Sequence, residues 1–329
     1  MDLLGIYGGA CPACVADAMA APEMARLAGV GMNCGCEYTA FPLFDFPVKG
    51  YSRLAHSEGV ARIVWRFTGD TRQAMAGLLH DVATPAFAHA IDFLNGDYDR
   101  QESTEAGAAA AIESSGAIQA ALKRCGLTTG DVCDDRPYPI ANNPTPGLSA
   151  DRLEYTLGLA WRRGIAALPE IERLYRDLSV ARNEHGEDEL AFGSADAAVR
   201  FARLALENAR MFTADEDRFS MRYLADLLRW ALDARVLAPG DLRRTEARLI
   251  GALIAHPEGR ARWRAFTRLR HVRRADRPGE GYWVKVPAKK RYVDPLVRGK
   301  GRASRLSGDL RARISEFQAL RFDAWLSGE

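Results

Sequence analysis

The chain has 329 residues, and 47% of them are hydrophobic, which is enough for one large domain or for a core domain with appendages. Its formal net charge is only +2, so overall charge gives no reason to expect a nucleic-acid partner. The first residues do not have the basic and then apolar pattern of a secretory signal, and no run of about eighteen apolar residues is present. Six cysteines are too few for a disulfide scaffold in a chain of this length. We therefore expect a soluble, cytoplasmic protein without a membrane span.

Most of the chain has apolar residues spaced three and four apart, which predicts a mainly α fold. The expected helices cover residues 15–28, 56–69, 71–81, 86–95, 105–124, 150–163, 166–182, 194–212, 218–235, 241–255 and 308–326. Start signals support three of them: Asp70 precedes one helix, Pro85 suits the first turn of another, and Ser149 can cap a third.

Strand patterns are sparse. Residues 38–41 are a short candidate, and residues 282–286 with 291–293 predict a small β-hairpin near the C-terminus. Residues 126–149 are rich in glycine and proline, which predicts a long loop of the kind that flanks or covers an active site. Residues 183–189 are acidic, and we expect a solvated loop there.

The adjacent pair His80 and Asp81 stands at the end of a predicted helix and can offer a nitrogen and an oxygen to one metal ion. His56 opens the preceding helix, so antiparallel packing would bring it close to the pair. Asp151 opens a later helix and could supply a fourth ligand. A buried histidine is more often a satisfied core residue, so the residues alone leave both interpretations open.

Three segments stand in order along the chain: residues 51–60, 76–81 and 150–155. In sequence and order they resemble the ligand motifs of the HD-domain superfamily of metal-dependent phosphohydrolases. Three more resemble the deoxynucleoside triphosphate triphosphohydrolase branch: residues 22–27, 38–42 and 84–92. The resemblance covers about residues 15–160 and implies an HD-domain helical bundle.

This resemblance implies one divalent metal ion, with manganese, magnesium, iron, cobalt and zinc as the candidates. The implied ligands are His56, His80, Asp81 and Asp151. It also implies that metal-activated water attacks phosphorus in a nucleotide or a related phosphate ester. Between residues 82 and 150 the single histidine is His89, which favours a mononuclear hydrolytic site over a di-iron oxygenase.

The same resemblance assigns roles around the metal. Arg53 matches a phosphate-contacting arginine, whose guanidinium can fork two oxygens. His89 matches a histidine near the phosphates and could act as a general acid or as a hydrogen-bond donor. Asp92, one turn later, could orient His89.

Two further histidines are common in the nucleotide triphosphohydrolases, and this chain has Thr84 and Thr104 in their places. Neither hydroxyl can transfer a proton near neutral pH. We expect Glu105, or alternatively Glu102, to serve instead if burial raises its pKa.

Two features lie outside the implied site. The spacing of Cys11, Cys14, Cys34 and Cys36 fits a structural zinc knuckle, and ordinary partly buried thiols are the alternative.

Residues 256–302 carry fifteen Lys and Arg against four Asp and Glu. Four of these cations lie at the predicted hairpin, and three of the four could clamp substrate phosphates: Lys289, Lys290 and Arg291. Alternatively this segment contacts nucleic acid, with neighbouring aromatic rings stacking on bases, or is an ordinary solvated face.

We therefore expect an HD-domain metal core in residues 1–165, a helical extension in 166–256, and a basic C-terminal segment with a hairpin and a final helix in 257–329. The favoured function is a metal-dependent nucleotide phosphohydrolase. The alternative is a catalytically weak regulatory module of the same fold that binds a nucleotide or nucleic acid. Long exposed helices would allow a homodimer.

Overall fold

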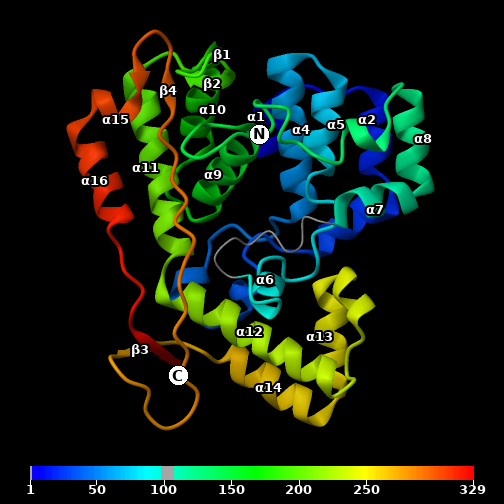
Figure 1. Ribbon diagram of the computed structural model, residues 1–329, viewed down its shortest axis with the longest axis vertical. Helices are drawn as coiled ribbons and strands as arrows, with labels where there is room; N and C mark the ends of the chain where they lie inside the picture. Colours follow the sequence, from blue (N-terminus) through cyan, green and yellow to red (C-terminus); the bar gives the residue numbers. More distant parts are fainter. Residues whose placement is uncertain (1, 98–106) are drawn as a thin grey trace.

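The computed structural model describes residues 2–97 and 107–329, and it is mainly helical (Figure 1). The helices of the first half are α1 (Leu3–Tyr7), α2 (Ala13–Met19), α3 (Pro22–Ala25), α4 (Arg53–Thr68), α5 (Thr71–Leu79), α6 (Ala90–Leu94), α7 (Ala108–Ser114), α8 (Gly116–Arg124) and α9 (Ala150–Arg162). Short 3-10 turns lie between them at Arg26–Gly29, Cys36–Tyr38, Pro42–Phe44 and Thr129–Asp131. The prediction of a mainly α fold is confirmed.

The second half continues with α10 (Leu168–Arg176), α11 (Ala195–Phe212), α12 (Asp215–Asp233), α13 (Glu246–Ala255), α14 (Pro257–Thr267), α15 (Ala303–Leu306) and α16 (Gly308–Gln318), with a 3-10 turn at Pro239–Arg243. Two small sheets accompany these helices. One has the order β1 (Leu178–Arg182), β2 (Asp188–Phe192), β4 (Leu296–Val297), β5 (Gly301–Arg302). The other pairs β3 (Val272–Ala275) antiparallel with β6 (Trp325–Gly328).

Side-chain caps fix where the helices that carry the site begin. Ser52 accepts a hydrogen bond from Ala55 N at the start of α4, and Asp70 accepts one from Arg72 N at the start of α5. Ser149 caps α9 in the same way. These caps satisfy backbone N–H groups that have no partner inside a helix. The first residues of α4 and α9 are therefore held in place by local chemistry.

Three main hydrophobic clusters surround this arrangement. One involves α1, α4, α9, α10, β2 and α11, and a second involves α6 and α12 to α14. The third packs α2 against α5, α7 and α8. The first and third clusters both include side chains of α4, so this helix is buried along most of its length. Burial of that apolar surface is the main stabilising contribution to the fold.

The predicted hairpin of residues 282–286 and 291–293 is wrong. Val284 forms a single bridge with Leu326, and the hairpin near the C-terminus is instead the short β4–β5 pair. Val284 packs into the second cluster and Val293 into the first. The alternating apolar pattern therefore buries side chains against helices, and no partner strand is needed.

The segment between β3 and β4 forms an extended connection that we call the strap (residues 276–295). In Figure 1 it is drawn in orange and runs from the end of the molecule near β3 to the opposite end, where β4 lies.

Several other element predictions are also corrected. The predicted helix 166–182 divides into α10 and β1, because a short apolar run fits either a helix or a strand and β2 supplies the partner. The predicted strand 38–41 is absent, since the 3-10 turn extends to Tyr38. The final helix ends at Gln318, and the chain then enters β6. Of the acidic stretch, Glu189 is buried and binds Arg302, so this part is not a solvated loop.

The predicted helix 105–124 breaks at Ser115, while residues 105 and 106 lie outside the described residues. The Ser115 hydroxyl accepts a hydrogen bond from Ile118 N and donates one to Glu23. A side chain that caps a new helix ends the preceding one. Among the described residues, no helix combines the length and apolar character needed to cross a membrane.

Candidate metal centre

His56, His80 and Asp151 converge on one point, although they come from three separate parts of the chain. His56 lies in the first turn of α4, His80 follows the last residue of α5, and Asp151 lies in the first turn of α9. His56 Nε2 is 3.1 Å from Asp151 Oδ1, and His80 Nε2 is 3.9 Å from the same oxygen. One ligand atom from each residue lies within 4.8 Å of the others. Within the described part of the chain, this is the only such group of three.

Both imidazole rings are held from behind. His56 Nδ1 lies 2.5 Å from Glu154 Oε2, and His80 Nδ1 lies 2.8 Å from the carbonyl oxygen of Gly77. An acceptor at Nδ1 places the proton there, so Nε2 is the atom that can bind a metal. Two such nitrogens and one carboxylate oxygen are a donor set that fits a divalent transition metal. The residues present therefore fit the expected divalent ion.

Asp81 is the fourth predicted ligand and lies at the edge of this group. Its Oδ2 is 3.6 Å from His80 Nε2, but the same oxygen accepts a hydrogen bond of 2.7 Å from Arg53. Its Oδ1 accepts a 2.7 Å bond from the Thr84 hydroxyl. Burial opposes ionisation, but the nearby Arg53 charge holds the pKa of Asp81 well below its usual range. A ligand role for Asp81 stays a prediction.

Two neighbouring carboxylates, Asp151 and Glu154, change the pKa of His56. Burial lowers the pKa of this imidazole, but hydrogen bonds to Asp151 and Glu154 outweigh burial and raise the pKa to about 10. For Asp151, burial favours the neutral acid, but the bond to His56 and its charge lower the pKa to about 2. The charged His56 imidazolium therefore offsets the negative charges of Asp151 and Glu154. A bound divalent cation would take over this positive charge.

His89 and Asp92 form a second pair beside the centre. His89 Nδ1 is 2.8 Å from Asp92 Oδ2, and Asp92 is fully buried. Burial lowers the pKa of His89; the Asp92 bond raises it, and the charges of Arg291 and Arg53 lower it further. The ring is therefore neutral at neutral pH. The predicted orienting contact of Asp92 is present, whereas the catalytic roles stay predictions.

The backbone that leads into His89 is unusual. Phe87 and Ala88 both have positive φ angles, 62° and 42°, as does Cys34 with 56°. Residues other than glycine rarely adopt this conformation, and such strain concentrates at functional sites. The His89 backbone lies close to Cys34, because it acts on the pKa of this thiol, which burial raises. The strained segments therefore meet at the edge of the candidate site.

The predicted substrate-binding cations separate in the structure. Arg53 is buried beside Asp81, and the charge of Arg291 lowers the pKa of His89, which places Arg291 near the site. Lys290 instead donates a 2.5 Å hydrogen bond to the Gln318 carbonyl. Lys289 is half-buried on the same strap. Three predicted or alternative residues lie outside the described part of the chain: Glu102, Thr104 and Glu105.

The structure contradicts the zinc knuckle and agrees, for Cys11, Cys34 and Cys36, with the alternative of ordinary thiols. Cys14 is bonded to Cys125, while Cys11, Cys34 and Cys36 are free thiols. Cys34 and Cys36 belong to the second hydrophobic cluster, and Cys11 and Cys14 pack against the third. The four cysteines therefore cannot share one ion in this fold. Sequence spacing alone carried no information about Cys125.

Two residues near the centre were missed from the sequence. Glu154 could have been found, because it lies one helical turn after Asp151 and so on the same face of α9. Asp135 had no signal, because it lies in the predicted loop. Burial raises its pKa, and the charges of His80 and Asp151 act on it. Its neighbour Asn142 donates a 3.2 Å hydrogen bond to Oδ1.

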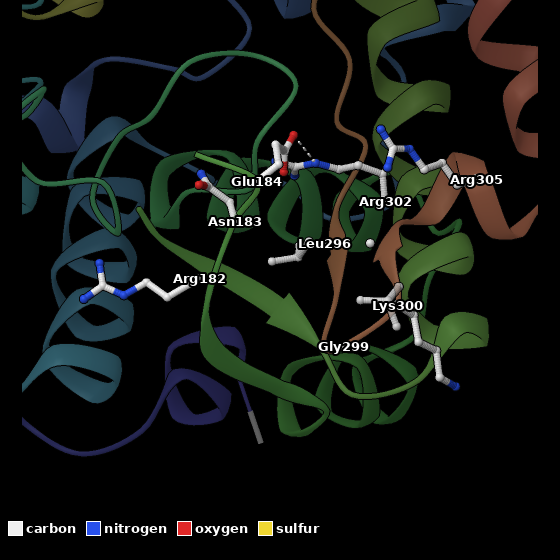
Figure 2. A pocket seen from close by; sticks show the side chains of 10 residues that line it. Arg182, Asn183, Glu184, Leu296, Gly299, Lys300, Arg302 and Arg305 are labelled. Carbon is white, nitrogen blue, oxygen red and sulfur yellow. Dashed lines mark hydrogen bonds and ion pairs between the residues drawn. The ribbon is translucent and has the colours of Figure 1, made fainter. Parts of the chain in front are cut away.

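A cavity of about 240 Å³ lies elsewhere, at the end of the four-stranded sheet (Figure 2). Its lining includes Arg182, Lys300, Arg302 and Arg305. Arg302 is already bound to Glu184 and Glu189, and in Figure 2 Arg182 and Lys300 point away from each other. None of the metal-centre residues lines this cavity.

Comparisons with known proteins found two distant relatives, and no protein-family model matches the chain. The Uncharacterized protein YdhJ of Bacillus subtilis is 29% identical over 208 residues, which cover 62% of this chain and 61% of YdhJ. The Metal-dependent phosphohydrolase cns2 of Cordyceps militaris is 27% identical over 175 residues, which cover 51% of this chain and 47% of cns2. The chain thus spans less than two thirds of either relative, and it is distantly similar to a protein named as a metal-dependent phosphohydrolase.

Proposed function

We propose that this chain is a metal-dependent phosphohydrolase with an HD-domain helical bundle. The observation that carries the proposal is the convergence of His56, His80 and Asp151, with the Nδ1 atoms of both rings already engaged. The distant similarity to cns2 supports the same class of reaction. The HD-like motifs around the three residues support the fold family and a metal core in residues 1–165.

The proposed substrate is a phosphate ester of a nucleotide, either a nucleoside triphosphate or a monophosphate. A divalent ion held at the centre would neutralise phosphoryl charge and lower the pKa of bound water. The protein itself must then bind the remaining phosphate oxygens. Arg53 and Arg291 are suited to this, because both charges act on His89 at the edge of the centre. Arginine forms forked hydrogen bonds that match two phosphate oxygens.

His89 would handle a proton in this reaction. With Nδ1 bonded to Asp92, its neutral ring presents an Nε2 lone pair and can accept a proton. A phosphate dianion bound beside the ring would raise the pKa of His89 and favour the protonated, donating form. Thr84 is not available for this task, because its hydroxyl holds Asp81. We therefore assign proton transfer on this side of the site to His89.

The test combines metal analysis with a product profile. The purified chain and a His80→Ala/Asp81→Ala variant would be analysed for bound metal by mass spectrometry. Both would then be given nucleoside mono-, di- and triphosphates with manganese, magnesium or cobalt. His185→Ala is the matched control, because His185 is an exposed histidine in the turn between β1 and β2.

We expect bound metal and released phosphate, pyrophosphate or triphosphate for the wild type and the control, and loss of both for the double variant. Equal metal content in the wild type and the double variant would contradict the proposed centre. Tight nucleotide binding without any turnover would instead favour a regulatory module of the same fold.

A further inference from the structure

Glu154 is a buried carboxylate placed directly behind a metal-centre histidine. It lies on α9 one turn after Asp151, its exposed fraction is 0%, and its Oε2 is 2.5 Å from His56 Nδ1. The same oxygen accepts a hydrogen bond from the Tyr51 hydroxyl. Burying a charged carboxylate is costly unless hydrogen bonds and opposite charge compensate. Here the compensating groups are the His56 imidazole and the Tyr51 phenol.

A second phenol lies in the same buried space. Burial raises the pKa of Tyr7, and the Glu154 charge raises it further, so Tyr7 lies close to this carboxylate. The Tyr7 hydroxyl and Glu154 Oε1 are both buried, and a contact between these two side chains also raises the pKa of Tyr7. The Tyr175 hydroxyl bonds the Tyr7 carbonyl at 2.9 Å and fixes α1 in this position. Glu154 is therefore surrounded by groups that can hold it and not by solvent.

Two glycines in helix interiors make room for this arrangement. A Cβ atom on Gly59 of α4 would lie 2.6 Å from Glu154 Cγ and 2.8 Å from Oε1. A Cβ atom on Gly158 of α9 would lie 2.4 Å from the Tyr51 hydroxyl oxygen. Glycine inside a helix costs about 0.5–1 kcal/mol relative to alanine. Space for Glu154 and Tyr51 is the physical reason for glycine at both positions.

We propose that Glu154 is a positioning residue for metal binding, held by Tyr51 and accommodated by Gly59 and Gly158. It fixes the His56 ring with its proton on Nδ1, so that Nε2 faces Asp151 and His80. The ion is a divalent transition metal. The inference rests on the proposed function, because it requires that the centre binds such an ion. Glu154 touches neither metal nor substrate in this role and acts through His56.

A purely structural role makes a different prediction. If Glu154 only completed a buried hydrogen-bond network, its replacement would lower the stability of the metal-free chain and leave the affinity of the folded protein for metal unchanged. A positioning role lowers that affinity even where the fold is intact, because an outer carboxylate fixes the ring orientation and raises the basicity of the ligand.

The experiment measures manganese binding to the full chain by titration calorimetry, with the thermal melting of each metal-free variant recorded alongside. We expect Glu154→Gln to bind manganese about 10–100-fold more weakly, and Gly59→Ala to behave in the same way. Tyr51→Phe, which keeps the carboxylate, should show a smaller loss. Glu58→Gln is the control, because Glu58 precedes Gly59 on α4 and pairs with Arg62.

A spectroscopic signature completes the test. In the zinc-loaded chain with ¹⁵N-labelled histidine, the Nδ1 proton of His56 should give a downfield resonance that Glu154→Gln shifts or loses. Wild-type manganese affinity in Glu154→Gln, with binding lost in His56→Ala, overturns the inference and leaves the metal centre intact. If the wild type binds no manganese, the proposed metal centre itself is contradicted, and the inference loses its premise. Should Glu154→Gln fail to fold, unchanged affinity in Tyr51→Phe overturns the inference instead.

Discussion

Arg53 Nη1 lies 2.7 Å from Asp81 Oδ2, and both side chains are buried. Arg53 opens α4 and Asp81 follows α5, so this ion pair joins the ends of the two helices that carry His56 and His80. The Arg53 charge compensates Asp81, while the Nε atom of Arg53 has no hydrogen-bond partner in the described structure. The pair therefore links the stability of the fold to the geometry of the candidate centre.

Removal of Arg53 should destabilise the protein strongly. Arg53→Gln leaves the buried Asp81 carboxylate without its countercharge, and breaking a buried pair in this way costs about 3–5 kcal/mol. The free energy of unfolding in urea measures the effect. The Arg53→Gln/Asp81→Asn double variant should lose less than the sum of the single variants, since the two residues interact directly. A loss below about 1 kcal/mol for Arg53→Gln would show that the pair is not needed for stability.

Metal binding should release a proton and strengthen as pH rises. The pKa of His56 in the metal-free chain is raised to about 10, so Nε2 carries a proton at neutral pH that a metal must displace. We expect close to one proton released per ion at about pH 7–8, and higher manganese affinity toward about pH 9. Calorimetry in two buffers with different ionisation enthalpies counts the protons. A result that does not depend on the buffer would contradict a protonated His56.

Glu37 should make the protein less stable as pH rises. Burial, and then the charge of Glu246, raise the pKa of Glu37 to about 7. In the unfolded chain its pKa is near 4.5, so between about pH 4.5 and 7 the folded state holds more protons and stability falls with increasing pH. The free energy of unfolding of Glu37→Gln should therefore fall by about 2–3 kcal/mol less than that of the wild type over this pH range, since one pKa unit corresponds to about 1.4 kcal/mol.

The Glu37 prediction is checked by urea unfolding at about pH 5 and pH 7.5, where the two states differ in protonation. Glu113→Gln serves as the control, because Glu113 is an exposed carboxylate on α7. Parallel pH profiles for the wild type and Glu37→Gln would show that Glu37 ionises normally in the folded protein.

The pairing of Cys14 with Cys125 can be tested directly. Peptide mapping without reduction should recover the two cysteines in one cross-linked fragment, with the other four alkylated. Because the bond spans 111 residues, Cys125→Ser should lower the free energy of unfolding by about 2–5 kcal/mol under oxidising conditions. Alkylation of all six cysteines in the untreated protein would contradict the bond.

Local sequence patterns anticipated the helices that carry the site and three converging side chains. Asp70 and Ser149 cap α5 and α9 as expected, because capping depends on neighbours two or three residues away. His56, His80 and Asp151 each lie at or beside the end of a helix, although α4 begins at Arg53 and not at residue 56 as predicted.

The strap shows where such reasoning stops. Its alternating valines have the pattern of a strand, yet Val284 and Val293 pack against different helix clusters. Apolar residues at every second position indicate that one face of an extended segment is buried. They do not indicate which element covers that face. The hairpin β1–β2 was missed for the same reason, since only its pairing distinguishes it from the end of a helix.

The sequence by itself determined the helical class, the starts of α5 and α9, and the types of side chain at the candidate centre, because these follow from periodicity and from chemistry within a few residues. Only the tertiary structure decided that Cys14 joins Cys125, that Asp81 is compensated by Arg53, and that Glu154 stands behind His56. Each of these depends on two segments that are distant in the chain and are brought together by burial of apolar surface, and no local pattern contains that information.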